Sequence, residues 1–192
     1  MTSEAPWRQG IKELLSQRQR QVITAEGLKP SAVLVLIYEK MGEYYIVLTK
    51  RTQDVEHHKG QMSFPGGAYD ERDGDLETTA LREAFEEIGV RGEDVEILGN
   101  LDDQATLTSN FVIMPYVGAI TYPYGFRVNR REVEELIEAP VAVLLNPDCF
   151  RPQGSKGKLD PHGYYQCGEY NITGITAIIL KQFLELVFSK VS

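Results

Sequence analysis

Glu83, Glu86 and Glu87 are the side chains whose type and spacing most suggest chemistry in this sequence. At i, i+3 and i+4 they share one face of a predicted helix, where like charges cost about 0.2–0.5 kcal/mol per pair. Arg82 is the only cation of that segment. A group outside the helix should therefore neutralise the carboxylates. Mg²⁺ suits them, because it takes oxygen ligands from a few carboxylates and from substrate phosphates.

The segment that carries these glutamates is predicted to be an amphipathic helix. Leu81, Ala84, Phe85 and Ile88 recur at spacings of three and four, which places them on one face. We expect that face to be buried, opposite the glutamates. Gly89 stands where a left-handed residue would close the helix.

The residues before the helix also have predictable roles. Asp73 or Asp75 is a suitable N-cap, and acidic residues favour the first turn of a helix. Upstream of them, Gly66 and Gly67 allow backbone amides to approach a ligand without an intervening side chain.

Residues 82–90, REAFEEIGV, together with Gly67 upstream, resemble the signature of the Nudix hydrolases, G-x5-E-x7-R-E-U-x-E-E-x-G-U, where U is apolar. The resemblance implies a metal-dependent pyrophosphohydrolase acting on a small nucleotide. It also implies Mg²⁺ or Mn²⁺ as cofactor, with Glu83, Glu86 and Glu87 as catalytic metal ligands.

The chain departs from this signature at one place. It has one residue more between Gly67 and Arg82 than the pattern allows. The position eight residues before Arg82 is Gly74, which is flanked by Asp73 and Asp75. Either aspartate could replace the first glutamate of the signature.

Residues 48–67 resemble a second signature, that of the coenzyme A pyrophosphatase subgroup, which reads roughly L-L-T-x-R-[SA]-x3-R-x3-G-x-x-x-F-P-G-G. The matching residues are Leu48, Thr49, Arg51, Gly60, Phe64, Pro65, Gly66 and Gly67. Arg51 and Lys59 are the nearby cations able to bind phosphate, arginine through two hydrogen bonds and lysine as a point charge. Phe64, Gly66 and Gly67 are expected to shape the substrate side of the helix entrance.

Two positions oppose the match to this subgroup. Glu56 stands where the subgroup has arginine, and Thr173 where it has tryptophan. A carboxylate in place of a phosphate-binding arginine would weaken binding of coenzyme A, so these positions leave the substrate open.

Residues 129–145 resemble the subgroup's N-P-x-E-V-x-E-x-x-x-V-P-L pattern, with Glu132 and Glu135 at its glutamates. A carboxylate near bound metal is a chemically sensible general base if it reaches a water molecule. The alternative is a short acidic helical turn without catalytic role.

The remaining chain predicts an α/β fold with a mixed sheet between helices. Expected strands cover 32–38, 44–49, 95–101, 111–121 and 164–170, and expected amphipathic helices cover about 7–22 and 172–189. Pro115 predicts an edge or a bulge in its strand. The resemblance implies the Nudix α/β/α sandwich, with 1–192 as one domain and the Nudix box at 67–90.

Composition limits the classes of partner. The chain has 192 residues and a net charge of −8, without the basic face of a nucleic-acid binder. No apolar segment suits a signal peptide or a membrane span. Cys149 and Cys167 are expected to stay reduced, which favours a cytoplasmic location. The N-terminal helix would pack on the domain or on a partner subunit, so a homodimer is left open.

Three functions remain open from sequence. The first is cleavage of coenzyme A to 4′-phosphopantetheine and adenosine 3′,5′-bisphosphate. The second is hydrolysis of another nucleotide, such as ADP-ribose or a nucleoside triphosphate. The third is a non-catalytic nucleotide-sensing module, against which the three glutamates argue. The Gly- and Pro-rich residues 147–163 are expected to form a loop that closes over substrate.

Overall fold

The computed structural model describes residues 5–52, 61–106, 109–152 and 163–188. Its helices are α1 (Pro6–Ser16), α2 (Leu76–Ile88), α3 (Val141–Leu144) and α4 (Gly174–Phe188), with short 3₁₀ turns η1 (Glu71–Asp73), η2 (Gly92–Asp94) and η3 (Pro147–Cys149). The main sheet contains β1 (Lys29–Lys40), β2 (Glu43–Arg51), β3 (Met62–Ser63), β4 (Gly66–Ala68), β5 (Glu96–Asn100), β6 (Gln104–Ala105), β7 (Phe111–Ala119) and β8 (Val133–Pro140). A smaller sheet contains β9 (Phe150–Arg151), β10 (Tyr164–Cys167) and β11 (Tyr170–Ile172).

Strand β1 organises the main sheet. Its second half forms a hairpin with β2, and its first half pairs with β4, both antiparallel. On its other edge it runs parallel to β7. Strand β8 pairs with the far edge of β2, so the described sheet is mixed, as predicted.

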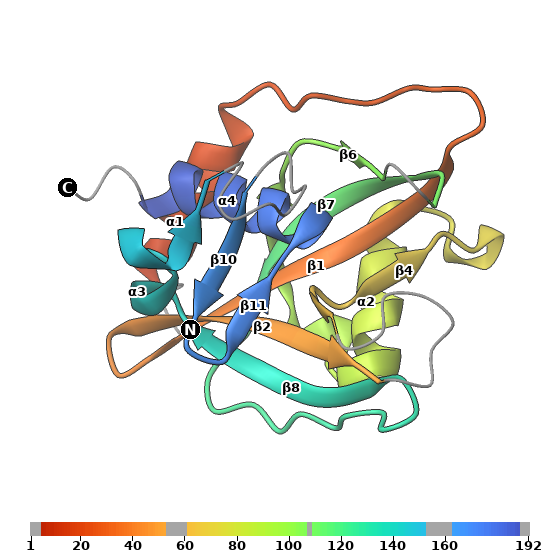
Figure 1. Cartoon of the computed structure of the whole chain (residues 1–192). Coiled ribbons are helices and arrows are strands. Elements are labelled where there is room, and N and C mark those ends of the chain that lie inside the picture. Colours follow the sequence, from red (N-terminus) through yellow and green to blue (C-terminus); the bar gives the residue numbers. More distant parts are fainter. Residues whose placement is uncertain (1–4, 53–60, 107–108, 153–162, 189–192) are drawn as a thin grey trace.

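Helices cover both faces of this sheet (Figure 1). Alternate residues of β1, Leu34 and Leu36 among them, pack with Ala84 and Ile88 of α2. The residues between them, such as Val35, pack in a second cluster with α1 and α4. The predicted α/β/α sandwich is therefore confirmed, and α2 alone covers the first of these faces among the described helices.

The first helix is shorter than predicted. It ends at Ser16 rather than near residue 22. Two adjacent aspartates hold the following segment in an irregular path that crosses the top of Figure 1 to reach β1. Asp102 binds Arg18 and accepts from the backbone N–H of Gln21. Asp103 forms an ion pair with Arg20 at 2.7 Å and accepts a hydrogen bond from the backbone N–H of Ile23 at 3.0 Å. These contacts replace further helical hydrogen bonds.

Two other expectations need correction. Pro115 lies in the interior strand β7, without a bulge at that residue. It is tolerated because the neighbouring chain is interrupted there, between β5, which pairs up to Tyr116, and β6, which pairs from Ile113. The acidic segment after residue 132 is strand β8 rather than a helical turn. It pairs with β2, and its side chains Val133, Ile137 and Ala139 are buried.

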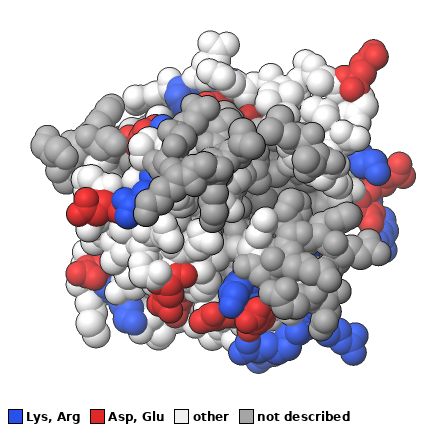
Figure 2. Space-filling view, in the orientation of Figure 1, with Lys and Arg blue, Asp and Glu red and all other residues white. Residues whose placement is uncertain are grey.

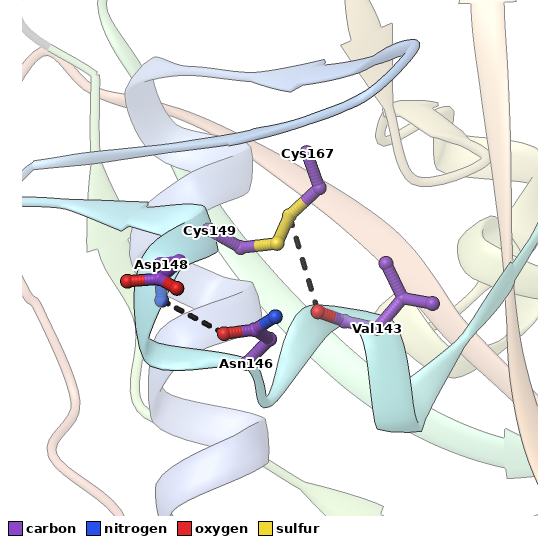
Figure 3. The surroundings of a disulfide bond; sticks show 5 residues. All are labelled: Val143, Asn146, Asp148, Cys149 and Cys167. Carbon is purple, nitrogen blue, oxygen red and sulfur yellow. Dashed lines mark hydrogen bonds between the residues drawn. A yellow bond between two sulfur atoms is a disulfide. The ribbon is translucent and has the colours of Figure 1, made fainter.

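The expectation of two reduced cysteines is wrong in this structure. Cys149 and Cys167 form a disulfide, shown in Figure 3. Pairing of β9 with β10 brings the two residues together, with their Cα atoms 4.8 Å apart. The sulfur of Cys167 also lies 3.9 Å from the carbonyl oxygen of Val143. Because disulfides are rare in reducing compartments, the cysteines no longer favour a cytoplasmic location.

Charged side chains of both signs are interspersed around the rim of the face shown in Figure 2. This distribution gives the visible described residues no extended basic face. Among the described helices, none has the length and apolar character needed to cross a membrane.

Candidate active site

Helix α2 has the ends that the sequence predicts. The Asp75 carboxylate accepts a hydrogen bond from the backbone N–H of Thr78 at 2.7 Å, which makes Asp75 the N-cap. Gly89 closes the helix in the left-handed conformation, with φ at 72°. These caps fix where the glutamates stand along the helix.

The buried face of α2 is rotated from the predicted one. Phe85 is 57% exposed, whereas Glu87 is 3% exposed. The helix rests on the sheet through Ala80, Ala84 and Ile88, all fully buried. Small alanines allow close packing at this face, and the rotation carries Glu87 inward while Phe85 points to solvent.

The two glycines lie at close approaches, Gly66 against the backbone of β1 and Gly67 against the carboxylate of Glu83. A Cβ atom on Gly66 would lie 2.3 Å from the carbonyl oxygen of Ala32 in β1. A Cβ atom on Gly67 would lie 2.5 Å from the carboxyl carbon of Glu83. The backbone of β4 therefore forms a wall directly against Glu83.

Arg82 neutralises part of the acidic face from within. Its guanidinium donates to Glu83 Oε1 at 2.7 Å and to Glu86 Oε2 at 3.2 Å. This finding corrects the expectation that only an external group neutralises the glutamates. Burial raises the pKa of Glu83, and the contact with Arg82 opposes that rise.

The structure also separates the roles of the two aspartates. Asp73 binds Arg82 through both oxygens, at 2.8 Å and 3.0 Å. Arg82 accordingly lowers the pKa of Asp73 to about 2. Asp75 caps α2 instead. Asp73 is therefore the aspartate that lies with Glu83, Glu86 and Glu87, a group called the acidic cluster below.

Glu87 is the most unusual group of the site. Its Oε1 lies 3.8 Å from Nη1 of Arg51. Its Oε2 is buried without a hydrogen-bond partner in the described structure, and the same is true of Arg51 Nε. Burial raises the pKa of Glu87 to about 8; Arg51 and the Gly66 amide oppose the rise, whereas the charges of Glu83 and Glu132 add to it.

A divalent metal needs several oxygen donors that point to one place. Within the described ranges, no three acidic, histidine or cysteine side chains converge on one point. Arg82 occupies oxygens of Glu83 and Glu86 instead. The unpartnered, buried oxygen of Glu87 is nevertheless a carboxylate donor without a ligand, and carboxylate oxygens are what Mg²⁺ and Mn²⁺ prefer. The carboxylates therefore suit such a metal by donor type, although the described side chains do not converge on one point.

The two glutamates near β8 lie in different places. Glu132 precedes β8 and contributes to the raised pKa of both Glu83 and Glu87. Glu135 lies inside β8, opposite Lys50 of β2. Its charge adds to the burial that raises the pKa of Tyr170, which packs on the face covered by α4. The structure therefore brings Glu132, and not Glu135, to the acidic cluster.

The predicted substrate-binding residues also divide. Arg51 lies at the cluster, as do Gly66 and Gly67. Phe64 is 3% exposed and packs in the core on the α4 side, so its contribution is to anchor the chain before the glycines. Lys59 lies outside the described residues, together with Glu56 and residues 153–162 of the expected loop.

Asn129, the first residue of the 129–145 pattern, has a position that the sequence did not predict. The structure places it between α2 and Glu132, with hydrogen bonds to both. The pattern itself was the signal, because Asn129 precedes Glu132 by three residues, a spacing that allows a local side-chain contact.

Comparison with known proteins identifies relatives of this arrangement. Residues 28–145 match the model of the NUDIX domain family. An uncharacterised Nudix hydrolase NudL of Pectobacterium atrosepticum is 36% identical over 141 residues, 71% of this chain and 72% of the relative. Its counterpart in Escherichia coli strain SMS-3-5 is 31% identical over 180 residues, 90% of this chain and 92% of the relative.

Solved structures show the same fold. The Nudix hydrolase RenU of M. smegmatis superposes with a TM-score of 0.59 at 17% identity, covering 88% of this chain and 90% of that chain. The Nudix domain of Shewanella oneidensis NrtR, crystallised with ADP ribose, gives 0.54 at 16% identity, covering 94% and 97%.

Proposed function

The chain belongs to the Nudix hydrolases, which makes it a pyrophosphohydrolase, and on that premise we propose that it cleaves the diphosphate of coenzyme A or its derivatives. The products would be 4′-phosphopantetheine and adenosine 3′,5′-bisphosphate. The observation that carries the proposal is the buried Glu87 carboxylate, unpartnered at one oxygen and beside Arg51.

Glu83, Glu86 and Glu87 are assigned as the ligands of Mg²⁺ or Mn²⁺. A bound divalent metal would neutralise charge on the diphosphate and lower the pKa of a bound water. Arg51 would bind a phosphate oxygen, since a guanidinium forms two charge-assisted hydrogen bonds with phosphate. Glu132 would accept the proton of the attacking water as general base. Glu135, also a sequence candidate, is less suited because it lies across the sheet from these groups.

Support for coenzyme A comes from two segments that meet at the cluster. The Phe64–Gly67 match supplies the wall against Glu83. The 129–145 match supplies Glu132 beside Glu87. Glu56 and Thr173, which differ from the subgroup, count against full affinity for coenzyme A.

Of the two alternatives, only the second Nudix substrate class keeps support from the site. Another nucleoside diphosphate derivative, such as ADP-ribose, or a nucleoside triphosphate is equally compatible with the carboxylates and Arg51. A non-catalytic nucleotide-sensing module would need neither an unpaired buried carboxylate nor a nearby base, so the site disfavours it. Three further expectations stay predictions. They are that residues 1–192 form one domain, that the protein acts in the cytoplasm without nucleic-acid or membrane partners, and that it forms a homodimer.

A substrate panel tests the proposal. Purified protein with Mg²⁺, and separately with Mn²⁺, would be given coenzyme A, dephospho-coenzyme A, ADP-ribose and ATP. Release of adenosine 3′,5′-bisphosphate from coenzyme A, at a higher kcat/KM than that for ADP-ribose and ATP, supports the assignment. Preference for ADP-ribose or ATP replaces coenzyme A with the second function.

A further inference from the structure

We propose that Asn129 is a positioning residue that holds Glu132 against the C-terminal end of α2. In this arrangement, one residue sets the distance between Glu132 and Glu87. The inference rests on the proposed function, because it treats Glu132 as the group that acts on the attacking water.

The hydrogen bonds of Asn129 reach both partners. Its backbone N–H donates to the carbonyl oxygen of Glu87 at 2.9 Å. Its side-chain Nδ2 donates to Glu132 Oε1 at 3.0 Å. Its carbonyl oxygen accepts from the N–H groups of Glu132 and Val133, at 3.1 Å and 2.9 Å. A single residue thus connects the backbone of one candidate catalytic residue, through its own backbone N–H, to the carboxylate of another, through its side chain.

The end of α2 explains why the segment docks there. The last carbonyls of a helix lack intrahelical partners. The N–H of Arg127 donates to the carbonyl oxygen of Ile88 at 2.9 Å, and the N–H of Asn129 donates to that of Glu87. The approach is close, because a Cβ on Gly89 would lie 2.7 Å from Cβ of Arg127.

The other side of Glu132 is attached to β2. The N–H of Thr52 donates to the Glu132 carbonyl oxygen at 3.0 Å. Thr52 follows Arg51, whose side chain lies beside Glu87. The backbone of Glu132 is therefore fixed between α2 and β2, and the Asn129 amide fixes its side chain.

Only an amide of this length meets both demands on the side chain. Oδ1 accepts from the N–H of Arg131 at 3.2 Å, while Nδ2 donates to Glu132. Aspartate would keep the first bond and lose the second, since an ionised carboxylate only accepts. Restricting a flexible glutamate before reaction removes an entropic cost, and small misplacements of catalytic groups lower rates strongly.

The substitution Asn129→Asp removes this donor and keeps the acceptor; it also places a negative charge beside Glu132, and both changes displace the Glu132 carboxylate. Its matched control is Asn146→Asp, because Asn146 Oδ1 likewise accepts a backbone N–H two residues on, that of Asp148, at 2.9 Å. We expect Asn129→Asp to lower kcat about tenfold or more and to change KM by less than about twofold. Asn146→Asp should leave both constants unchanged.

A double-mutant cycle with Glu132→Gln decides whether Asn129 acts through Glu132. If it does, Asn129→Asp lowers kcat no further in the Glu132→Gln background. The same factor in both backgrounds, or wild-type kcat for Asn129→Asp, overturns the inference.

Urea unfolding of wild type, Asn129→Asp, Glu132→Gln and the double variant supplies a readout that does not need activity. Coupling between the two substitutions is expected, because they share one hydrogen bond. Additive effects on stability would overturn the contact itself. A wild-type protein inactive on every diphosphate tested would instead overturn the proposed function, and the catalytic part of this inference with it.

Discussion

Arg51 and Glu87 meet at the centre of the site, with Nη1 and Oε1 3.8 Å apart. Neither is fully satisfied, because Arg51 Nε and Glu87 Oε2 are buried without hydrogen-bond partners among the described residues. Buried polar groups normally find partners. A pair of opposite charges with unused donor and acceptor atoms is suited to bind a phosphate on one side and a cation on the other.

Replacing Arg51 should damage substrate binding. We expect Arg51→Ala to lower kcat/KM roughly tenfold to hundredfold, because a charge-assisted hydrogen bond contributes about 1.5–3 kcal/mol. Steady-state kinetics on the best substrate of the panel measures the effect. Arg72→Ala is the control, since Arg72 is 88% exposed and pairs with Asp70 at the surface. An Arg51→Ala enzyme with the kcat/KM of the control would contradict a phosphate-binding role.

Glu87 should make metal-free protein less stable as pH rises. Its pKa, raised to about 8 from 4.5, means that the folded state holds the proton more tightly than the unfolded chain does. The free energy of unfolding in EDTA should therefore fall between about pH 4.5 and pH 8. Glu87→Gln cannot ionise, so it should be more stable than wild type at pH 8 by roughly 1–3 kcal/mol.

Urea unfolding at pH 5 and pH 8 checks this expectation. Glu86→Gln, at a half-exposed position, is the control and should retain the wild-type pH dependence. If wild type and Glu87→Gln lose equal stability between the two pH values, the Glu87 carboxylate is not the cause.

Asp73 and Asp75 should respond differently to the same substitution. Asp73→Asn removes the charge that binds Arg82, so we expect a loss of about 1–3 kcal/mol at neutral pH together with reduced kcat. Asp75→Asn should change stability by less than about 0.5 kcal/mol, because asparagine is an equally good N-cap. The Asp73 pKa is lowered to about 2, so its contribution should be lost as pH falls from about 3.8 to 2. Equal effects of the two substitutions would contradict these separate roles.

The Cys149–Cys167 disulfide closes a loop with a sequence separation of 18 residues. Loop-closure entropy predicts that its removal costs about 3 kcal/mol. We expect dithiothreitol to lower the melting temperature of wild type, and to have no effect on a Cys149→Ser, Cys167→Ser variant. Two free thiols in denatured, unreduced protein, with an unchanged melting temperature, would restore the reduced cysteines expected from sequence.

The sequence predicted the features that depend on local pattern. The strands at 32–38 and 44–49 and the caps of α2 each follow from a few neighbouring residues, and the structure contains all of them. The spacing of Glu83, Glu86 and Glu87 predicted an acidic site in the same way.

Features that depend on distant partners were not predictable. Periodicity gave α2 an apolar face, but two buried alanines against the sheet determine that Phe85 faces solvent and Glu87 faces inward. Asp102 and Asp103 hold the segment after the first helix from 80 or more residues away in sequence. The positions of Cys149 and Asn129 likewise follow from strand pairing and docking to α2, which no local pattern contains.

The most direct test of the assigned site is hydrolysis of coenzyme A by wild type, Glu86→Gln and Glu87→Gln, each with Mg²⁺ and with EDTA. Chromatography would measure the adenosine 3′,5′-bisphosphate released. We predict release by wild type with Mg²⁺, loss of that activity in EDTA, and turnover lowered by a factor of about 100 or more in both variants, since a carboxylate ligand is needed to hold the metal at the diphosphate. Unchanged release in EDTA, or wild-type turnover by either variant, would contradict the site.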